Sequence, residues 1–259
     1  MTLRGCKSIG YALMHIQGIS KLDILPSMNE GEGPGIRAEY LTMPPKFPKP
    51  SKLPPKDGRN SVRIIGGGWR GRRVNFPDLP GLRPTPDRVR ETLYNWLQHA
   101  IVGTRCLDLF AGSGALGLEA LSRGAAAVVF VEQAQAAARA LVAELARLGG
   151  TPRARVVEMG ASRFLRTAGE GHGRPYGGPF DIVFMDPPFG QEALADYIPL
   201  LDAGGWLKTG GLVYLESEKS AGAPVVPAHW ELLKSKSAGE VGYHLARANA
   251  RAADAPTGP

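Results

Sequence analysis

A carboxylate, two prolines and an aromatic ring follow one another in the second half of the chain, as Asp186, Pro187, Pro188 and Phe189. The run before them, residues 180–185, is rich in branched and aromatic side chains and predicts a buried β-strand. Because proline fixes its own φ and restricts the residue before it, Asp186 and Pro187 are expected to be extended, with carbonyl groups that point outward. A fixed carboxylate, a fixed carbonyl and a ring suit a planar amino group, although a plain proline turn after a strand would look the same.

A glycine-rich turn forms a second candidate site. Residues 105–109 predict a strand and residues 115–123 a helix, and Gly112 and Gly114 lie in the turn between them. Glycine lets the backbone come close to a ligand, and the start of a helix offers free N–H groups. The turn alone does not identify the ligand, because a nicotinamide dinucleotide would also suit it.

Two carboxylates indicate which ligand the glycine-rich turn binds. Asp108 stands just before the turn, where it would repel a pyrophosphate but attract the ammonium group of an amino acid. Glu132 ends the next predicted strand, where an acid can bind both hydroxyls of a ribose. An amino acid at one end and a nucleoside at the other describe S-adenosylmethionine, whose adenine would lie on the backbone after the third strand. The residues expected to bind this cofactor are Asp108, Phe110, Ala111, Gly112, Ser113, Gly114, Glu132, Gly160 and Ala161.

Alternating strands and helices position both candidate sites. The alternation predicts an α/β fold with a doubly wound, mostly parallel sheet, in which ligands lie beyond the carboxyl ends of the strands. The last two strands have no helix between them, so we expect an antiparallel pair at the sheet edge. The strands are expected near 105–109, 127–131, 154–158, 181–185, 211–216, 230–235 and 241–247. The helices between them are expected near 115–123, 134–147, 161–167 and 191–202.

A basic β-hairpin is expected before this sheet. Residues 62–65 and 69–74 have strand patterns, and the three glycines between them can form the bend. Its exposed face would carry arginines beside a tryptophan. Guanidinium groups grip phosphates and aromatic rings stack on bases, which favours RNA binding over a hairpin with merely solvated charges. The residues expected to bind RNA, on the hairpin and on the helix that follows, are Arg63, Trp69, Arg70, Arg72, Arg73, Arg83, Arg88 and Arg90.

That helix has a recognisable start. Thr85 is expected to be its N-cap, Pro86 its first helical residue, and Asp87 part of the electropositive first turn. One apolar stripe follows at helical spacing, formed by Val89, Leu93, Trp96, Leu97 and Ala100. Arg88 and Arg90 lie off this stripe, where they could face a phosphate, the cofactor or solvent.

The charge distribution predicts a polyanion as partner. The formal net charge is +7; residues 43–90 hold 12 Lys and Arg against 3 Asp, a local net of +9, so the rest of the chain sums to −2. Cys6 and Cys106 make no disulfide framework, and the five histidines lack the spacing of metal ligands, so we expect no metal site. The chain has no membrane-length apolar run and no secretory signal pattern, which predicts a cytoplasmic protein.

Composition also suggests the domain organisation. Residues 1–60 are rich in proline and glycine and predict a disordered basic extension, with Met43 as an alternative start of the protein. Residues 61–84 would form the RNA-binding hairpin, residues 85–248 the methyl-transfer domain, and residues 249–259 a polar tail.

The chain resembles the amino-methylating branch of the class I methyltransferases, whose signature is Asp or Asn, two prolines and an aromatic residue. Within that branch it is similar to the RsmD family of 16S ribosomal RNA guanine-N2 methyltransferases. The segments that carry the resemblance are residues 63–67, 69–71, 81–85, 87–93, 110–120, 186–189 and 214–218. Departures from the family pattern are Gly160 near the adenine, Pro86 in place of a hydroxyl residue, and an insertion at residues 172–178.

The resemblance implies a seven-stranded Rossmann-like sheet, S-adenosylmethionine as methyl donor, and guanine 966 of 16S ribosomal RNA as target. It also implies a monomer that acts on the assembled or assembling 30S subunit. The Asp186 carboxylate and the Pro187 carbonyl would accept hydrogen bonds from the guanine amino group, while Phe189 would stack on the base.

Three other functions remain as alternatives. A DNA adenine-N6 methyltransferase would use the same four residues on the adenine amino group. A non-catalytic nucleic-acid-binding module would retain the fold without the reaction. A nicotinamide oxidoreductase is disfavoured because Asp108 opposes a pyrophosphate and because the basic segment would have no purpose.

Overall fold

A computed structural model of the chain describes residues 60–167, 176–188 and 194–250. The predicted extension up to residue 59, Phe189, residues 172–175 of the predicted insertion and residues 251–259 of the tail lie outside the described residues. No helix within the described ranges is long and apolar enough to cross a membrane.

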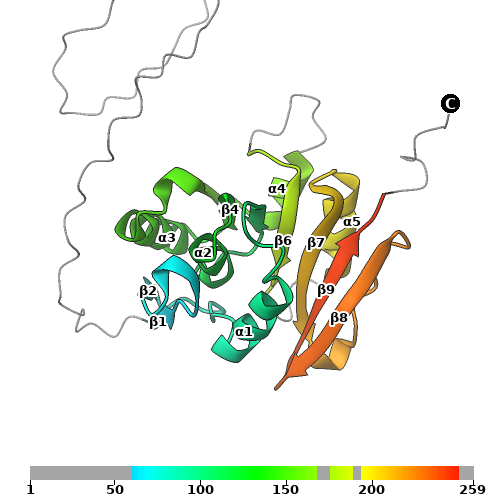
Figure 1. Cartoon of the computed structure of the whole chain (residues 1–259), viewed down its shortest axis with the longest axis horizontal. Coiled ribbons are helices and arrows are strands. Elements are labelled where there is room, and N and C mark those ends of the chain that lie inside the picture. The colour runs from blue at the N-terminus through cyan, green and yellow to red at the C-terminus, as the bar shows by residue number, and fades with distance from the viewer. Residues whose placement is uncertain (1–59, 168–175, 189–193, 251–259) are drawn as a thin grey trace, which may run out of the picture. The chain divides into compact units, whose positions relative to one another are not determined.

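A seven-stranded sheet forms the centre of the described structure, in the order β5-β4-β3-β6-β7-β9-β8 (Figure 1). Strands β3 to β7 run parallel to one another, and β9 is antiparallel to both of its neighbours, β7 and β8. The predicted α/β fold with an antiparallel edge pair is therefore confirmed. The strands are β3 (Arg105–Asp108), β4 (Ala127–Glu132), β5 (Ala154–Glu158), β6 (Phe180–Met185), β7 (Leu207–Glu218), β8 (Trp230–Ala238) and β9 (Val241–Ala248).

Helices cover both faces of the sheet. Alternate residues of one strand face opposite sides, so Phe184 packs in the core beneath three of the helices while Val183 packs against the other two. The first face carries α1 (Asp87–Trp96), α2 (Ala115–Ser122) and α3 (Gln135–Leu148). The second carries α4 (Ala161–Arg166) and α5 (Leu194–Ala203).

Helix α1 begins differently from the sequence prediction. Val89, Leu93 and Leu97 of the predicted stripe are buried, but the N-cap is Pro86, with no side-chain capping bond. The predicted N-cap role of Thr85 is wrong, because its hydroxyl donates instead to Asp186. A distant carboxylate has replaced the local backbone as the partner of this side chain.

The predicted hairpin is present before α1. Strand β1 (Asn60–Arg63) pairs antiparallel with β2 (Arg73–Phe76), and a short 3₁₀ turn at Gly67–Trp69 lies between them. Its inner side chains are buried against α2 and α3, which lie beside it in Figure 1. Trp69 belongs to this buried set, with 9% of its surface exposed, and the Arg153 guanidinium lies over its ring. The prediction of an exposed Trp69 is therefore wrong.

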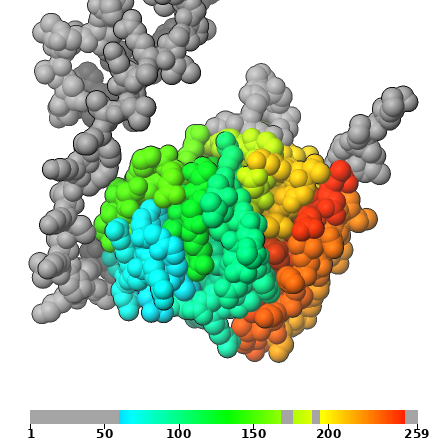
Figure 2. All heavy atoms as spheres, viewed as in Figure 1, coloured from blue at the N-terminus to red at the C-terminus, as the bar shows by residue number. Residues whose placement is uncertain are grey.

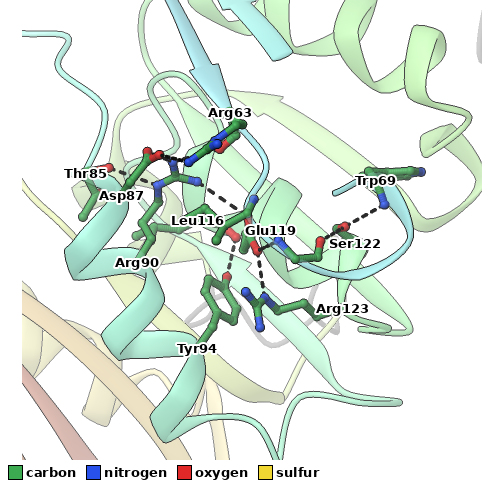
Figure 3. A network of polar contacts seen from close by, with 12 residues as sticks. Arg63, Trp69, Thr85, Asp87, Arg90, Tyr94, Leu116, Glu119, Ser122 and Arg123 are labelled. Atoms are coloured by element: carbon green, nitrogen blue, oxygen red, sulfur yellow. Dashed lines mark hydrogen bonds and ion pairs between the residues drawn. The ribbon is translucent and has the colours of Figure 1, made fainter. Parts of the chain in front are cut away.

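Glu119 of α2 binds the hairpin to the rest of the protein (Figure 3). Its fully buried carboxylate accepts hydrogen bonds from Ile65 N at 2.8 Å and Gly66 N at 2.7 Å, and from Arg123 Nε at 2.7 Å. The close approach requires glycine at Gly67, where φ is +73° and a Cβ atom would lie 1.9 Å from a backbone oxygen of α2. The hairpin is thus fixed to the helix that follows the glycine-rich turn.

Arg90 connects the hairpin, α1 and α2. Only 1% of its surface is exposed, and its guanidinium donates to Thr85 O at 3.0 Å, to Arg63 O at 2.9 Å and to Asp87 Oδ1 at 2.5 Å. It also lies 3.6 Å from Glu119. The predicted RNA contact of Arg90 is therefore wrong, because this arginine is the internal partner of a buried carboxylate.

Candidate active site

Several carboxyl groups lie at the carboxyl edge of the sheet. Asp108 ends β3 and is paired in register with Phe130 of β4 and Phe184 of β6. Glu132 and Asp186 each lie two residues beyond those partners, so parallel pairing brings all three acids to one edge. The negative charges of Asp186 and Glu132 both contribute to the raised pKa of Asp108, which is consistent with this placement.

Asp108 lies beneath the glycine-rich turn. It is 2% exposed, and its Oδ2 accepts a hydrogen bond from Gly117 N at 2.9 Å. Burial raises the pKa of Asp108 to about 7, while the bond from Gly117 acts in the opposite direction. Glycine is needed at 117, because a Cβ atom there would lie 2.2 Å from the Phe130 ring. Asp108 therefore holds the first turn of α2 close to the strands.

The turn itself has the backbone conformation that its glycines predict. Gly112 and Gly114 have φ values of +51° and +75°, and α2 begins directly after them at Ala115. Gly114 N donates to Ala111 O at 2.6 Å, which closes the turn. Ser113 is buried within it. Phe110, just before the turn, is half-buried in edge-to-face contact with Tyr197 of α5.

Glu132 fixes the turn from the side of β4. Its Oε2 accepts from Gly112 N at 2.8 Å and its Oε1 from Ala134 N at 2.7 Å. The side chain is half-buried, and each carboxylate oxygen keeps lone-pair capacity for a ligand hydroxyl. Beyond β5, Gly160 is the N-cap of α4, and the nearest atom to a Cβ there would be Gln133 Oε1 at 3.7 Å. Among the described residues, the only atom within 4 Å of that Cβ position is this amide oxygen, at ordinary contact distance, so a ligand can approach the Gly160 backbone closely.

Asp186 is held by a second set of polar side chains. Thr85 Oγ1 donates to Asp186 Oδ2 at 3.1 Å, and Glu216 of β7 is hydrogen-bonded to the same carboxylate. Loss of hydration raises the pKa of Asp186 to about 6, although the hydrogen bonds from Thr85 and Glu216 act against this rise. Burial, followed by the charge of Asp186, raises the pKa of Glu216 well above its usual value.

Glu216 is a site residue that the sequence reasoning did not select. It is 2% exposed, and Tyr214 donates its hydroxyl to Glu216 Oε1 at 2.7 Å. A sequence pattern could have identified Glu216, because it comes directly after the apolar residues of a predicted strand, as Asp186 does. Pro187, after Asp186, is buried and Pro188 is half-buried, while Phe189 lies outside the described residues.

The predicted RNA-binding residues divide into two groups. Trp69 and Arg90 are buried, as described above. The exposed residues of the set are Arg63, Arg70, Arg72, Arg73, Arg83 and Arg88. Among these, Arg63 pairs with Asp87 at 3.2 Å.

An open surface hollow of about 380 Å³ lies between the basic hairpin and the start of α1. Arg63 and Arg73 of the hairpin line it together with Thr85, the residue that contacts Asp186. Figure 2 shows the hairpin, in cyan, as part of one continuous surface with the neighbouring green and teal segments. Arg63 and Arg73 therefore share this hollow with the residue whose hydroxyl contacts Asp186.

The comparisons with known proteins agree on a family. The family model described as "Conserved hypothetical protein 95" matches residues 62–247. "Ribosomal RNA small subunit methyltransferase D" of Escherichia coli K12 is 50% identical over 194 residues, which cover 75% of this chain and 93% of the relative. The Haemophilus influenzae protein of the same name is 42% identical over 195 residues, covering 75% and 97%. The solved structure "Putative methyltransferase yhhF from Escherichia coli" is 47% identical, with a TM-score of 0.67, and the match covers 74% of this chain and 100% of that one.

Proposed function

The chain belongs to the RsmD family of ribosomal RNA small subunit methyltransferases, and from this premise we propose that it methylates the exocyclic N2 of a guanine in 16S ribosomal RNA. The methyl donor is S-adenosylmethionine, and the family points to guanine 966 as the target. The observation that carries the proposal is the half-buried Asp186 carboxylate, held by Thr85 and Glu216 beside the acids that end β3 and β4.

The acidic residues at the carboxyl edge of the sheet suit S-adenosylmethionine as a ligand. Asp108, Glu132 and Asp186 would attract its ammonium and sulfonium charges, whereas they would repel a pyrophosphate. Glu132 would accept the ribose hydroxyls, and the backbone at Gly160 and the buried Ala161 would lie along the adenine. When bound, this molecule supplies an electrophilic methyl group. The glycine-rich turn would hold this molecule, and Glu132 and Asp108 fix the turn from two sides.

The acceptor half of the site uses the residues after β6. The lone pair of a guanine amino group is delocalised into the ring, so the nitrogen is a poor nucleophile. Hydrogen bonds accepted from its two N–H groups favour a tetrahedral nitrogen and aim its lone pair. Asp186 and the Pro187 carbonyl would accept these bonds, and an Asp186 oxygen would take the proton that the nitrogen loses. Phe189 would stack on the base, an interaction worth roughly 1–3 kcal/mol.

The exposed arginines of the hairpin would bind the RNA phosphates. Two of them, Arg63 and Arg73, line the hollow that Thr85 also lines, which supports entry of the base from that side. The substrate would be the 16S RNA within the assembled or assembling 30S subunit, and the protein would act as a monomer in the cytoplasm.

Transfer of a labelled methyl group to different acceptors tests this function. Purified protein and labelled donor would be incubated with 30S particles, naked 16S RNA or duplex DNA, all prepared without the modification. We expect label in ribosomal RNA, with mass mapping placing it as one N2-methylguanosine. Label in adenine of duplex DNA would favour the adenine-N6 alternative, and no binding of the donor at all would favour a non-catalytic module.

A further inference from the structure

The structure assigns Glu216 to the site as a positioning residue: a protonated Glu216, together with the Thr85 hydroxyl, holds the Asp186 carboxylate in the orientation in which it accepts the target amino group. This inference rests on the proposed function, because it needs Asp186 to be the acceptor of the substrate N–H. It adds two residues, Glu216 and Thr85, to the four that follow β6.

Sheet register brings the two acids together. Strands β6 and β7 are parallel, with Phe184 paired to Tyr214 and Met185 paired to Leu215. The next residues along the two strands are Asp186 and Glu216, so their side chains leave the sheet edge next to each other. They share the face of Phe184 and Tyr214, which is the face that α1 covers. Thr85 lies just before α1, and this explains how its hydroxyl reaches Asp186.

The burial of the two acids and their hydrogen bonds favour a proton on Glu216. Two carboxyl groups in contact away from water do not both ionise, so one of them carries a proton. Glu216 is 2% exposed whereas Asp186 is half-buried, and the charge is therefore better solvated on Asp186. Tyr214 donates to Glu216 Oε1 at 2.7 Å, which leaves the other oxygen of Glu216 to carry the proton and donate it to Asp186. The raised pKa of Glu216 agrees with this assignment.

The consequence for Asp186 is a fixed and ionised acceptor. Thr85 and Glu216 each donate to one lone pair of the carboxylate, and the remaining lone pairs stay open for a substrate N–H. A carboxylate whose rotation is fixed in this way is already oriented before the base enters. Removal of Glu216 would leave Asp186 held by Thr85 alone and Tyr214 without its acceptor. The expected defect is one of geometry and not of substrate affinity.

Substitutions that keep or remove the donor test the assignment. Glutamine at 216 keeps an N–H donor for Asp186 and a carbonyl acceptor for Tyr214, so Glu216→Gln mimics the protonated acid. Methyl transfer to 30S particles, donor affinity and thermal unfolding would be measured for Glu216→Gln, Glu216→Ala and, as matched control, Glu218→Ala. Glu218 is on the same strand, two residues further on, and is exposed.

We expect Glu216→Ala to lower kcat on the order of 100-fold, the loss typical of about 1 Å of misplacement, with KM and donor affinity nearly unchanged. Glu216→Gln should restore most of that loss, and Glu218→Ala should match the wild type. Equal kcat for Glu216→Ala and wild type would overturn the inference, as would a Glu216→Gln variant that folds but is no better than alanine.

Thr85 supplies an independent test if Glu216→Ala does not fold. Thr85→Val removes only the hydroxyl, and Thr85→Ser keeps it. We expect valine to lower kcat about tenfold, as for one lost hydrogen bond to a charged group, and serine to stay near the wild type. Valine and serine variants with the same kcat would contradict the inference. If the wild type transferred no methyl group to 30S particles, the proposed function itself would fail. An active wild type with equally active variants would contradict only the role of Glu216 and Thr85.

Discussion

The hydroxyl of Thr85 donates to Asp186 Oδ2 across 3.1 Å, although the two residues are 101 positions apart in the sequence. Thr85 belongs to the segment that joins the basic hairpin to α1, and its carbonyl accepts a hydrogen bond from Arg90. The part of the protein that is expected to bind RNA is therefore in direct contact with the carboxylate that is expected to bind the target base. Thr85 therefore links the segment expected to bind RNA with the residue that would accept the target amino group.

The buried pair of Arg90 and Glu119 should be essential for stability. Arg90→Ala removes a buried guanidinium that donates to Thr85 O and Arg63 O and lies 3.6 Å from Glu119. Glu119 keeps Arg123 as a charge partner, so we expect a loss of about 3 kcal/mol, chiefly from the buried acceptors left unpaired. Arg88→Ala, two residues earlier and exposed, should change the free energy of unfolding by no more than about 0.5 kcal/mol. Urea unfolding of both variants measures the difference. Equal stabilities would show that the network in Figure 3 does not hold the hairpin in place.

The exposed arginines of the hairpin should contribute to RNA affinity through phosphate contacts. Charge reversal at Arg70, Arg72 and Arg73 should weaken binding of 16S RNA and reduce the slope of log affinity against log salt by about 1 for each lost contact. Fluorescence anisotropy at several salt concentrations measures this slope, and calorimetry should show unchanged binding of S-adenosylmethionine.

A control variant separates local contacts from net charge. Arg139, Arg163 and Arg166 are exposed on α3 and α4, and their reversal changes the net charge by the same amount. We expect a smaller loss of RNA affinity than for the hairpin variant. Equal losses in the two triple variants would mean that the hairpin has no specific role.

Glu132 should decide the affinity for the methyl donor. Glu132→Gln removes a charge-assisted acceptor worth about 1.5–3 kcal/mol, so the dissociation constant for S-adenosylmethionine should rise about 10- to 100-fold. Glu158→Gln is the matched control, because Glu158 is paired in register with Glu132 on the neighbouring strand and is exposed. Isothermal titration of both variants measures the effect. A dissociation constant for Glu132→Gln equal to that of the control would remove Glu132 from the ribose site.

Methylation should depend on pH through Asp186. Its pKa is raised from 3.8 to about 6, so the acceptor carboxylate becomes protonated as the pH falls through about 6, where an ordinary aspartate is still ionised. Protonation removes a hydrogen-bond acceptor, and kcat/KM for RNA should therefore decline below that pH. A profile of kcat/KM between pH 4.5 and 8, measured over a range in which the fold is intact by circular dichroism, tests this expectation. A constant kcat/KM down to pH 4.5 would show that the ionised form of Asp186 is not required.

The sequence was sufficient for the sheet and for the acids along its carboxyl edge. Asp108, Glu132 and Asp186 were found because each lies at the carboxyl end of a strand with a clear apolar pattern, and parallel strands bring these ends to one edge. Glu216 also lies at the carboxyl end of a strand. Its hydrogen bond with Asp186 joins two strands, so no local sequence pattern could predict it.

The misassigned residues were those whose environment comes from distant segments. Trp69 and Arg90 are buried because the hairpin packs on α2 and α3, and Trp69 N donates to Ser122, 53 positions away. Thr85 has the residue type and position of an N-cap, and only the folded chain brings Asp186 within reach of its hydroxyl. The local preferences of these residues were predicted correctly, but contacts with distant segments determine their environment in the folded chain.

The most direct test is methyl transfer by Asp186→Ala, compared with wild type on the same 30S particles. Labelled S-adenosylmethionine would report turnover, and calorimetry would report donor affinity for both proteins. We expect the variant to bind the donor nearly as well as the wild type and to transfer no methyl group to N2 of guanine. Near-normal methylation by Asp186→Ala would contradict the assignment of Asp186 as the residue that receives the target amino group.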